Sequence, residues 1–283
     1  MLILAPLRGV TINAFRRAFA SQISAAGFTA AIAPFIPANP GIKVRDAFLK
    51  EVLPFEAGLT PQVITRDPTS MRILLRAFKE HGYTTADLNA GCPFPMIVKR
   101  GRGSGLIRTP ALFEELVRVG VEEMGEGNFS VKTRLGVSSP REIEQILPIL
   151  AKYPLRFATI HGRTAREMYS GACNKTALGE IARTAPFKVV LNGDFSVSDA
   201  PVYGDIMVGR SFVRSLGTLA DSSALLAGYM DLSRSELSGD GPVLGRMKEL
   251  VLYWTETSQR WKRLWPVLKI ARTVREFASA LPA

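Results

Sequence analysis

Eight short apolar runs rich in β-forming residues recur along the chain, and helical patterns lie between most of them. The runs are Leu2–Pro6, Ala30–Phe35, Gln62–Thr65, Ala86–Asn89, Ser130–Arg134, Phe157–His161, Lys188–Asn192 and Asp205–Gly209. Strands that alternate with helices predict a parallel sheet, because parallel strands need long crossover connections. Eight such units favour an α/β fold of the TIM (β/α)8 barrel type. An open doubly wound sheet has the same alternation and is the alternative at this point.

Helical periodicity is clearest in three segments between the runs. Apolar residues at i, i+3, i+4 and i+7 spacing occur at Met71, Leu74, Leu75 and Phe78, and similar spacing recurs in 112–119 and 143–150. Thr109-Pro110 and Ser139-Pro140 predict helix starts, since proline is well tolerated at the first helical position. The stretch Leu53–Pro61 predicts a long loop, and Asp194–Gly204 is too short for a full barrel helix.

The barrel pattern ends near Leu216, and Ser233–Pro242 has the composition of a turn-rich linker. We therefore expect a barrel domain at residues 1–232 and a small helical domain at 242–283. The predicted apolar stripes of the second domain are Leu244, Met247, Val251 and Trp254, then Trp261, Leu264, Trp265 and Leu268, then Val267, Ile270, Val274, Phe277 and Leu281. Lys269, Arg272 and Arg275 fall near the opposite face of the last stripe.

The charge of the chain points to a polyanionic partner. There are 36 Lys+Arg against 25 Asp+Glu, a formal charge of +11, and the segment from Pro242 onward is strongly basic. Clustered Lys and Arg bind phosphates without regard to sequence, so RNA, DNA and an anionic membrane surface all fit, and a merely solvated basic face is the alternative. Two cysteines indicate a reducing compartment, and no apolar run approaches the ~20 residues of a membrane span. The apolar run at the N-terminus, Met1–Pro6, is too short for the apolar region of a signal peptide, so we expect a cytoplasmic protein.

The segment richest in reactive side chains is Asp87–Pro95, which is followed by Lys99–Gly105. A strand that ends at Asn89 places Cys92 at the mouth of the barrel, where active sites of this fold lie, beside Lys99, Arg100 and Arg102. A thiol there could act as nucleophile, metal ligand or proton donor. CxxC and HxxxH patterns are absent, which argues against zinc. An unperturbed thiol pKa of about 8.5 suits proton delivery, but an isolated cysteine is also often just a small buried residue.

Polar residues also close the later strands. Lys132 and Arg134 alternate on one strand and so share a face. Three further strands end in His161-Gly-Arg-Thr164, Asn192-Gly-Asp194 and Gly209-Arg210. The loops after the seventh and eighth strands form the usual phosphate site of this barrel.

Taken in order, these motifs resemble those of the tRNA-dihydrouridine synthase family. The similar segments are 5–11, 87–93, 99–101, 131–136, 161–164, 169–171, 192–194 and 207–210. The resemblance implies an FMN-dependent barrel enzyme with a C-terminal helical domain, which reduces the C5–C6 double bond of uridine in tRNA with NADPH. Reduced FMN would deliver a hydride to C6 of uracil, and Cys92 would protonate C5.

The resemblance also implies roles for individual residues. Cys92 matches the catalytic proton donor. The residues that match cofactor contacts are Pro6, Leu7, Gln62, Lys132 and His161 along the flavin, with Asn192, Gly193, Asp194, Gly209 and Arg210 at its ribityl phosphate. Asn89, Arg134 and Tyr169 match contacts to uracil. Cys173 matches no role and is interpreted as structural. Leu7 stands where Met is common in the family, and both the seventh-to-eighth-strand connection and the helical tail are shorter.

We accordingly expect tRNA or another folded RNA as the partner of a monomeric enzyme, with no bound metal, no DNA and no membrane. Two alternatives stay open. The first is a flavin barrel that reduces a free pyrimidine or enone, which leaves the basic tail unexplained. The second is a non-catalytic RNA-binding barrel, against which the presence of Cys92, Lys132 and His161 argues.

Overall fold

The strands of the protein form one parallel sheet in a computed structural model that describes residues 1–54 and 56–281. They are β1 (Leu2–Leu4), β2 (Ala30–Ile32), β3 (Ile36–Pro37), β4 (Leu59–Thr60), β5 (Gln62–Ile64), β6 (Ala86–Ala90), β7 (Phe129–Gly136), β8 (Phe157–Thr164), β9 (Val189–Asn192) and β10 (Ile206–Val208). Their order is β3-β5-β6-β7-β8-β9-β10-β1-β2-β4. Each of the eight expected runs therefore contains a strand.

Two short strands lie outside the expected runs and help to close the sheet. β3 follows the run Ala30–Phe35, and β4 lies at the end of Leu53–Pro61, so the expectation that this stretch is a loop throughout was wrong. β4 and β5 are separated by Pro61 alone, which has no N–H to donate to a ladder. β2 pairs with β4, whereas β3, a few residues beyond β2, pairs with β5. The strand order therefore begins with the pair β3-β5 and ends with the pair β2-β4. In the chain β3 comes shortly after β2, and β5 comes directly after β4, so the two ends of the order lie next to each other. This closure confirms the barrel and excludes the open doubly wound sheet.

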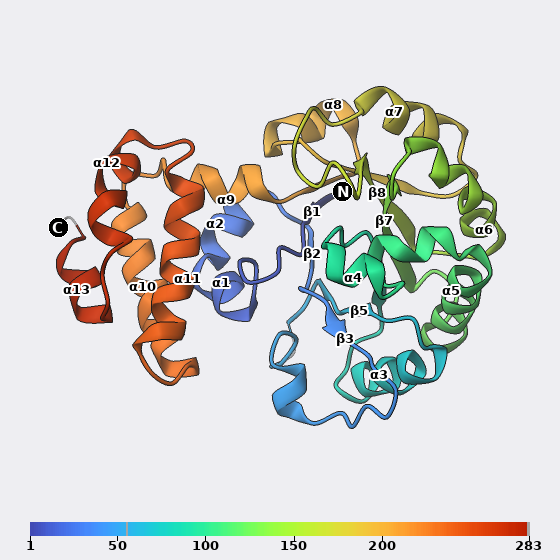
Figure 1. Ribbon diagram of the computed structural model, residues 1–283, viewed down its shortest axis with the longest axis horizontal. Helices are drawn as coiled ribbons and strands as arrows, with labels where there is room; N and C mark the ends of the chain where they lie inside the picture. Colours follow the sequence, from blue (N-terminus) through green and yellow to red (C-terminus); the bar gives the residue numbers. More distant parts are fainter. Residues whose placement is uncertain (55, 282–283) are drawn as a thin grey trace.

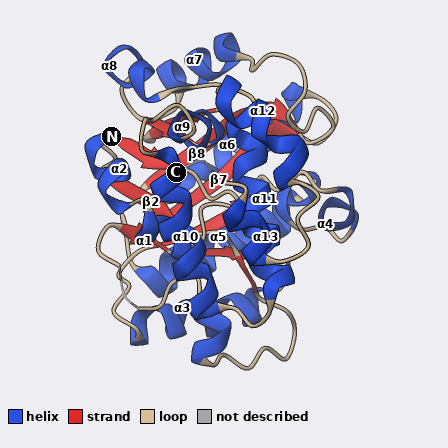
Figure 2. Ribbon diagram, turned by 90° about the vertical axis from the view of Figure 1, so that its left-hand side faces the viewer, coloured by secondary structure: helices blue, strands red, loops and turns tan. Residues whose placement is uncertain are grey.

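Helices surround the strands, as Figure 2 shows. Those of the barrel are α1 (Asn13–Ala18), α2 (Ala20–Ala25), α3 (Pro68–Glu80), α4 (Pro95–Lys99), α5 (Pro110–Met124), α6 (Leu147–Lys152), α7 (Lys175–Thr184), α8 (Ala200–Tyr203) and α9 (Arg210–Leu216). Short 3-10 helices are η1 (Asp46–Leu49), η2 (Gly103–Arg108), η3 (Pro140–Gln145) and η4 (Val197–Asp199). The predicted helix start at Pro110 is confirmed, and the one at Pro140 opens a 3-10 turn. As expected, no long helix fits between β9 and β10, where only η4 and α8 lie.

The interior of the barrel is apolar on one side and polar on the other. Ile3, Ala5, Ile32, Phe157, Val190 and Met207 form a buried cluster of their own. Opposite them, on β5, β6 and β7, the buried side chains include Gln62, Asp87 and Ser130. The residues between these on the same strands face outward into the larger core beneath the helices, because side chains alternate along a strand. The polar side of the interior leads up to the barrel mouth.

The C-terminal part is a bundle of four helices that packs against α1 and α9 (Figure 1). The helices are α10 (Ser222–Glu236), α11 (Asp240–Trp254), α12 (Gln259–Leu268) and α13 (Val274–Ser279). The Trp254 indole donates to the carbonyl of Val213 at 2.9 Å, and Gly217 leaves room for it, since a methyl group there would lie 2.5 Å from its Cβ. One continuous apolar core therefore joins the bundle to the barrel. No helix among the described residues is long and apolar enough to cross a bilayer.

Two expectations for this region were wrong. The segment Ser233–Pro242 is mostly helical and not a turn-rich linker, because α10 runs to Glu236 and α11 starts at Asp240. The last apolar stripe is also interrupted, because α12 ends at Leu268 and α13 begins only at Val274. Two of its members, Val267 and Ile270, are 55% and 69% exposed. The first stripe, on α11, is confirmed by the burial of all its members. The division into domains at 232 and 242 stays a prediction.

Candidate active site

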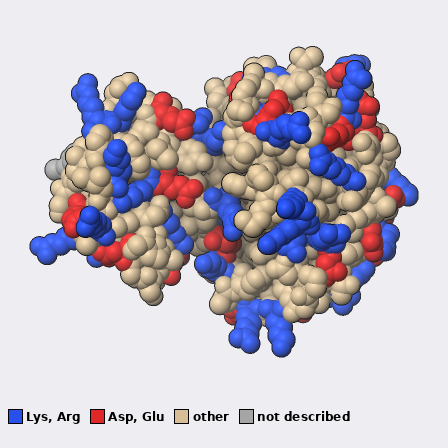
Figure 3. Space-filling view, in the orientation of Figure 1, with Lys and Arg blue, Asp and Glu red and all other residues tan. Residues whose placement is uncertain are grey.

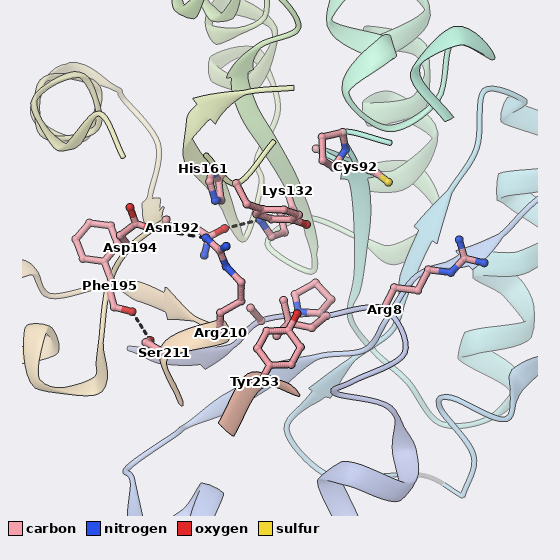
Figure 4. Close-up of a pocket in the computed structure, with 18 of the residues that line it drawn as sticks. Arg8, Cys92, Lys132, His161, Asn192, Asp194, Phe195, Arg210, Ser211 and Tyr253 are labelled. Atoms are coloured by element: carbon pink, nitrogen blue, oxygen red, sulfur yellow. Dashed lines mark hydrogen bonds and ion pairs between the residues drawn. The ribbon is translucent and has the colours of Figure 1, made fainter. Parts of the chain in front are cut away.

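The carboxyl ends of the barrel strands surround a cavity of about 680 Å³, a size typical of cofactor and substrate sites (Figure 4). It is lined by nearly all the residues that the sequence predicts for the site, namely Pro6, Leu7, Asn89, Cys92, Lys132, Arg134, His161, Tyr169, Asn192, Gly193, Asp194, Gly209 and Arg210. Gln62 is the exception, since it is fully buried inside the barrel. The carboxyl ends of the strands thus bring together side chains that are up to about two hundred positions apart in the chain.

Cys92 lies in a rigid turn just after β6. The Asn89 side-chain oxygen accepts hydrogen bonds from the backbone N–H of Gly91 at 3.2 Å and of Cys92 at 2.9 Å. On the other side, the Cys92 carbonyl accepts from the Ser104 N–H at 3.1 Å, and a methyl group at Gly103 would come within 2.8 Å of Cys92 Cβ. Burial raises the pKa of the thiol, although Arg134 and Arg8 partly oppose this. The thiol is therefore protonated at neutral pH.

A chain of buried hydrogen bonds supports this turn from below. Gln62 donates to the Asp87 carboxylate at 2.7 Å and accepts from the Asn89 amide at 2.8 Å. Asp87 also accepts from the Ser130 hydroxyl at 2.6 Å, and burial raises its pKa to about 6. Both ends of the Gln62 amide are thus occupied inside the barrel. Its predicted contact with a flavin stays a prediction, and the structure places it as a support for Asn89.

Lys132, His161 and Asn192 lie on the three successive strands β7, β8 and β9, beside the strand that leads to Cys92 (Figure 4). The Lys132 ammonium donates to the Asn192 side-chain oxygen at 2.6 Å, and the Asn192 amide donates to the Met207 carbonyl at 2.8 Å. Withdrawal from bulk water, helped by the nearby Arg134, lowers the pKa of Lys132 to about 7. Burial, followed by the charges of Arg134 and Lys132, lowers the pKa of His161 well below its usual value, so its imidazole is neutral. His161 Nδ1 is buried without a hydrogen-bond partner among the described residues.

Asp194 and Arg210 belong to an ion-pair chain that starts at Arg163. The buried Arg163 guanidinium contacts the Asp194 carboxylate through both terminal nitrogens, one at 2.9 Å, and Arg210 reaches the same carboxylate at 3.5 Å. Burial alone would raise the pKa of Asp194, but the hydrogen bonds and charge of Arg163 outweigh it, so its pKa is lowered. Asp194 therefore acts on Arg210 as an anion, and its predicted phosphate contact stays a prediction. Arg163 was not predicted for the site, although it lies in the His161–Thr164 motif.

Tyr169 lies between two arginines at the mouth. The Arg210 guanidinium is 4.5 Å from the centre of its ring and that of Arg134 is 5.3 Å from it. Arg134 also donates to the carbonyls of Gly91 at 2.9 Å and Met168 at 2.7 Å, so it ties the Cys92 turn to the loop after β8. These contacts join the thiol wall of the cavity to the Arg210 wall.

The cations near the thiol are not those expected from sequence proximity. Lys99 and Arg100 are exposed and do not line the cavity, and Arg102 is only half-buried. Arg8 and Arg134 are instead the cations that act on the pKa of the Cys92 thiol. The expectation failed because the chain turns outward through α4 before Gly103 and Ser104 return to the cysteine.

The C-terminal bundle supplies a wall of the cavity that the sequence did not reveal. Glu249, Leu252, Tyr253 and Glu256 of α11 line it, together with Arg214 of α9, which pairs with Glu256 at 2.6 Å. Arg8 and Phe35 complete the rim on the barrel side, with the guanidinium 5.3 Å from the ring centre. Hydrophobic periodicity and sequence motifs each describe one helix or strand by itself, so neither could have shown that α11 faces the mouth of the barrel.

Comparison with known proteins identifies relatives of this chain. A family model described as dihydrouridine synthase matches residues 3–212. tRNA-dihydrouridine synthase B of Vibrio parahaemolyticus is 28% identical over 196 residues, 68% of this chain and 59% of the relative's length. The enzyme of the same name from Proteus vulgaris is 26% identical over 241 residues, 80% of this chain and 73% of the relative.

Solved structures show a similar fold. The old yellow enzyme homologue from Zymomonas mobilis superposes with a TM-score of 0.52 at 14% identity, over 75% of this chain and 85% of that one. Morphinone reductase gives a TM-score of 0.53 at 11% identity, over 75% and 82% of the two chains. These likenesses concern the fold alone, whereas the family model covers most of the barrel and its site. The chain therefore belongs to the dihydrouridine synthase family.

Proposed function

We propose that the protein is a flavin-dependent tRNA-dihydrouridine synthase, which reduces the C5–C6 double bond of a uridine in tRNA with NADPH as the reductant. One observation carries the proposal: a buried, protonated thiol at Cys92 lines the same cavity as Lys132 and as His161, whose Nδ1 has no hydrogen-bond partner among the described residues. The family and the names of the relatives support the same reaction.

The residues of the cavity fit flavin mononucleotide. His161 Nδ1 is buried without a partner among the described residues, and the Lys132 ammonium has Asn192 as its one hydrogen-bond partner there. A buried polar atom left unpaired is costly, which favours a polar ligand at this wall. Arg210 would hold the phosphate, while Pro6 and Leu7 would lie along the ring system. A bound, reduced flavin would supply the hydride that C6 of uracil takes up.

Cys92 would give its proton to C5. Burial keeps the thiol protonated until the base arrives, which is what a general acid requires. Once the proton has left, the thiolate lies near Arg134 and Arg8, whose charges already act on the pKa of this group. A proton from solvent would then restore the thiol. Arg134 and Tyr169 would contact the uracil from the mouth.

A folded RNA partner would account for the arginines that line the cavity, Arg8, Arg134, Arg210 and Arg214. A uridine stacked in RNA must be swung out to enter a cavity at the end of a barrel. The α11 wall makes the entrance a joint product of the barrel and the bundle, so the residues 242–283 expected to form the helical domain would take part in presenting the base. The presence of two free cysteines fits the reducing environment of the cytoplasm.

The purified protein tests the proposal directly. It should be yellow, it should bleach with NADPH, and acid should release FMN. Unmodified tRNA transcripts should acquire dihydrouridine, which the mass of nucleosides after digestion reveals. A colourless protein that does not bind added FMN would overturn the proposal. Reduction of a free enone or pyrimidine with no product in RNA would favour the alternative flavin barrel.

A further inference from the structure

A group of cations lies on the barrel rim next to the Cys92 turn. Arg66 follows β5, and Lys99, Arg100 and Arg102 lie at the end of α4 and just after it. The Arg66 guanidinium rests against this loop, since a methyl group at Gly101 would be 3.6 Å from its Nη1. The space-filling view shows Lys and Arg gathered over the α4 region of the barrel (Figure 3). We call Arg66, Lys99, Arg100 and Arg102 the basic rim.

The charges of the basic rim are not neutralised within the protein. None of its four side chains forms an ion pair or hydrogen bond with any residue in 1–54 or 56–281. Cations on the outer face of α3 differ: Arg72 pairs with Glu122 at 3.1 Å and Arg76 with Glu123 at 3.0 Å. Burial, followed by the charges of Arg100 and Arg66, lowers the pKa of Arg102, and its Nε is buried without a partner. Cations crowded together in this way favour an anion from outside.

Apolar side chains are interleaved with these cations. Phe94 and Met96, at the start of α4, are 47% and 66% exposed. Phe94 also lines the cavity, so it connects the basic rim with the place where Cys92 lies. Cationic side chains with exposed aromatic rings are the usual composition of surfaces that bind single-stranded nucleic acid, in which bases stack on rings and phosphates meet cations.

We propose that the basic rim, with Phe94 and Met96, binds the RNA strand that flanks the target uridine. The inference rests on the proposed function, because it takes RNA as the substrate. Cations of the rim would neutralise phosphates next to the swung-out nucleotide, and Phe94 would stack on a neighbouring base. Since the loop after α4 packs on Cys92 through Gly103 and Ser104, a strand held here would deliver its nucleotide to the thiol side of the cavity.

A charge-reversal triple, Arg66→Glu, Lys99→Glu and Arg100→Glu, tests the surface. Arg102 is left unchanged because of its buried Nε. Binding of unmodified tRNA transcripts, measured at several salt concentrations, should weaken on the order of 100-fold, and the slope of log affinity against log salt should fall by about two. FMN affinity and flavin reduction by NADPH should stay at the wild-type level. Phe94→Ala should weaken binding by about 5- to 150-fold, and Phe94→Tyr should restore it.

The triple Lys269→Glu, Arg272→Glu and Arg275→Glu changes the formal charge by the same amount and is the matched reference. It should weaken tRNA binding less than the rim triple. If the wild type binds tRNA and reduces uridine but the rim triple does both equally well, the inference fails and the proposed function stands. If the wild type neither binds tRNA nor reduces its uridine, both fail. If the rim triple loses binding to phosphatidylserine vesicles while its tRNA binding is intact, the inference is also overturned and the basic rim is assigned to a membrane surface.

Discussion

The two sides of the cavity are built differently. On the side of β7 to β10, charged groups have polar or ionic partners: Lys132 bonds to the neutral amide of Asn192, and Arg163 and Arg210 share the Asp194 carboxylate. On the side of β1 to β6, the neutral Cys92 thiol is held by backbone contacts, and the cations beyond it have no anionic partner among the described residues. Preorganised groups suit a ligand that stays bound, whereas unpaired surface charge suits one that comes and goes. Under the proposed function, the first side would hold the phosphate and the polar edge of the cofactor, and the second would receive the RNA. We call them the cofactor side and the substrate side.

Replacing Cys92 should have the largest effect and should touch the substrate side alone. General acid catalysis typically contributes ~10²–10⁴-fold, so Cys92→Ala should lose about that much uridine reduction. Flavin reduction by NADPH needs no proton from this thiol and should persist, as stopped-flow absorbance would show. Cys92→Ser should be little better than Ala, because a hydroxyl is a far weaker acid. If Cys92→Ala reduces uridine at the wild-type rate, Cys92 is only a small side chain that packs in the turn and not the proton donor.

Lys132 tests the cofactor side through pH. Its pKa of about 7 lies below its usual value, so the ammonium loses its proton as the pH rises through 7. An anionic ligand favours the charged form of Lys132. Above pH 7, where Lys132 is mostly neutral in the free protein, FMN binding should therefore be accompanied by uptake of a proton. FMN affinity should then fall by at most about tenfold per unit between pH 7 and 9. Titrations of Lys132→Met should show weaker binding, by about 10- to 100-fold at pH 7, with no such slope. A slope that survives the substitution would exclude Lys132 as its origin.

Two glycines of the substrate side differ in one respect and form a matched pair. Gly101 and Gly103 both have positive φ, +67° and +53°. A side chain in this region costs about 1–2 kcal/mol. Only Gly103 also lies against Cys92, so Gly103→Ala should cost a further ~1–3 kcal/mol for overpacking. Urea denaturation of the two variants would measure this difference. Equal losses of stability would show that the close contact adds nothing to the rigidity of the thiol turn.

The smallest effect concerns the bundle. Lys269, Arg272 and Arg275 are exposed, although they do not share one helix as the sequence pattern predicted. Their reversal to Glu should weaken tRNA binding severalfold and lower its salt dependence, with FMN still bound. Filter binding at two salt concentrations would check this. Unchanged affinity would mean that this face is only solvated.

Much of the fold could be predicted from the sequence, because strands and helices leave local periodic traces. All eight expected runs contain strands, and the α11 stripe at Leu244, Met247, Val251 and Trp254 is buried. The errors occur where a helix boundary is decided by packing. Ser233–Pro242 looks like a linker, yet α10 and α11 extend into it while they pack on each other.

The site divides in the same way. Cys92, Lys132 and His161 follow or end strands, and parallel strands all bring their carboxyl ends to one edge of a barrel, so sequence alone determined that these side chains meet. The contacts across the mouth depended on tertiary structure. Arg8 and Arg134 rather than Lys99 and Arg100 lie near the thiol, Gln62 supports Asn89 from inside, and α11 forms a wall. Periodicity reports which way a side chain faces along its own element, whereas closure of the barrel and docking of the bundle decide what it faces.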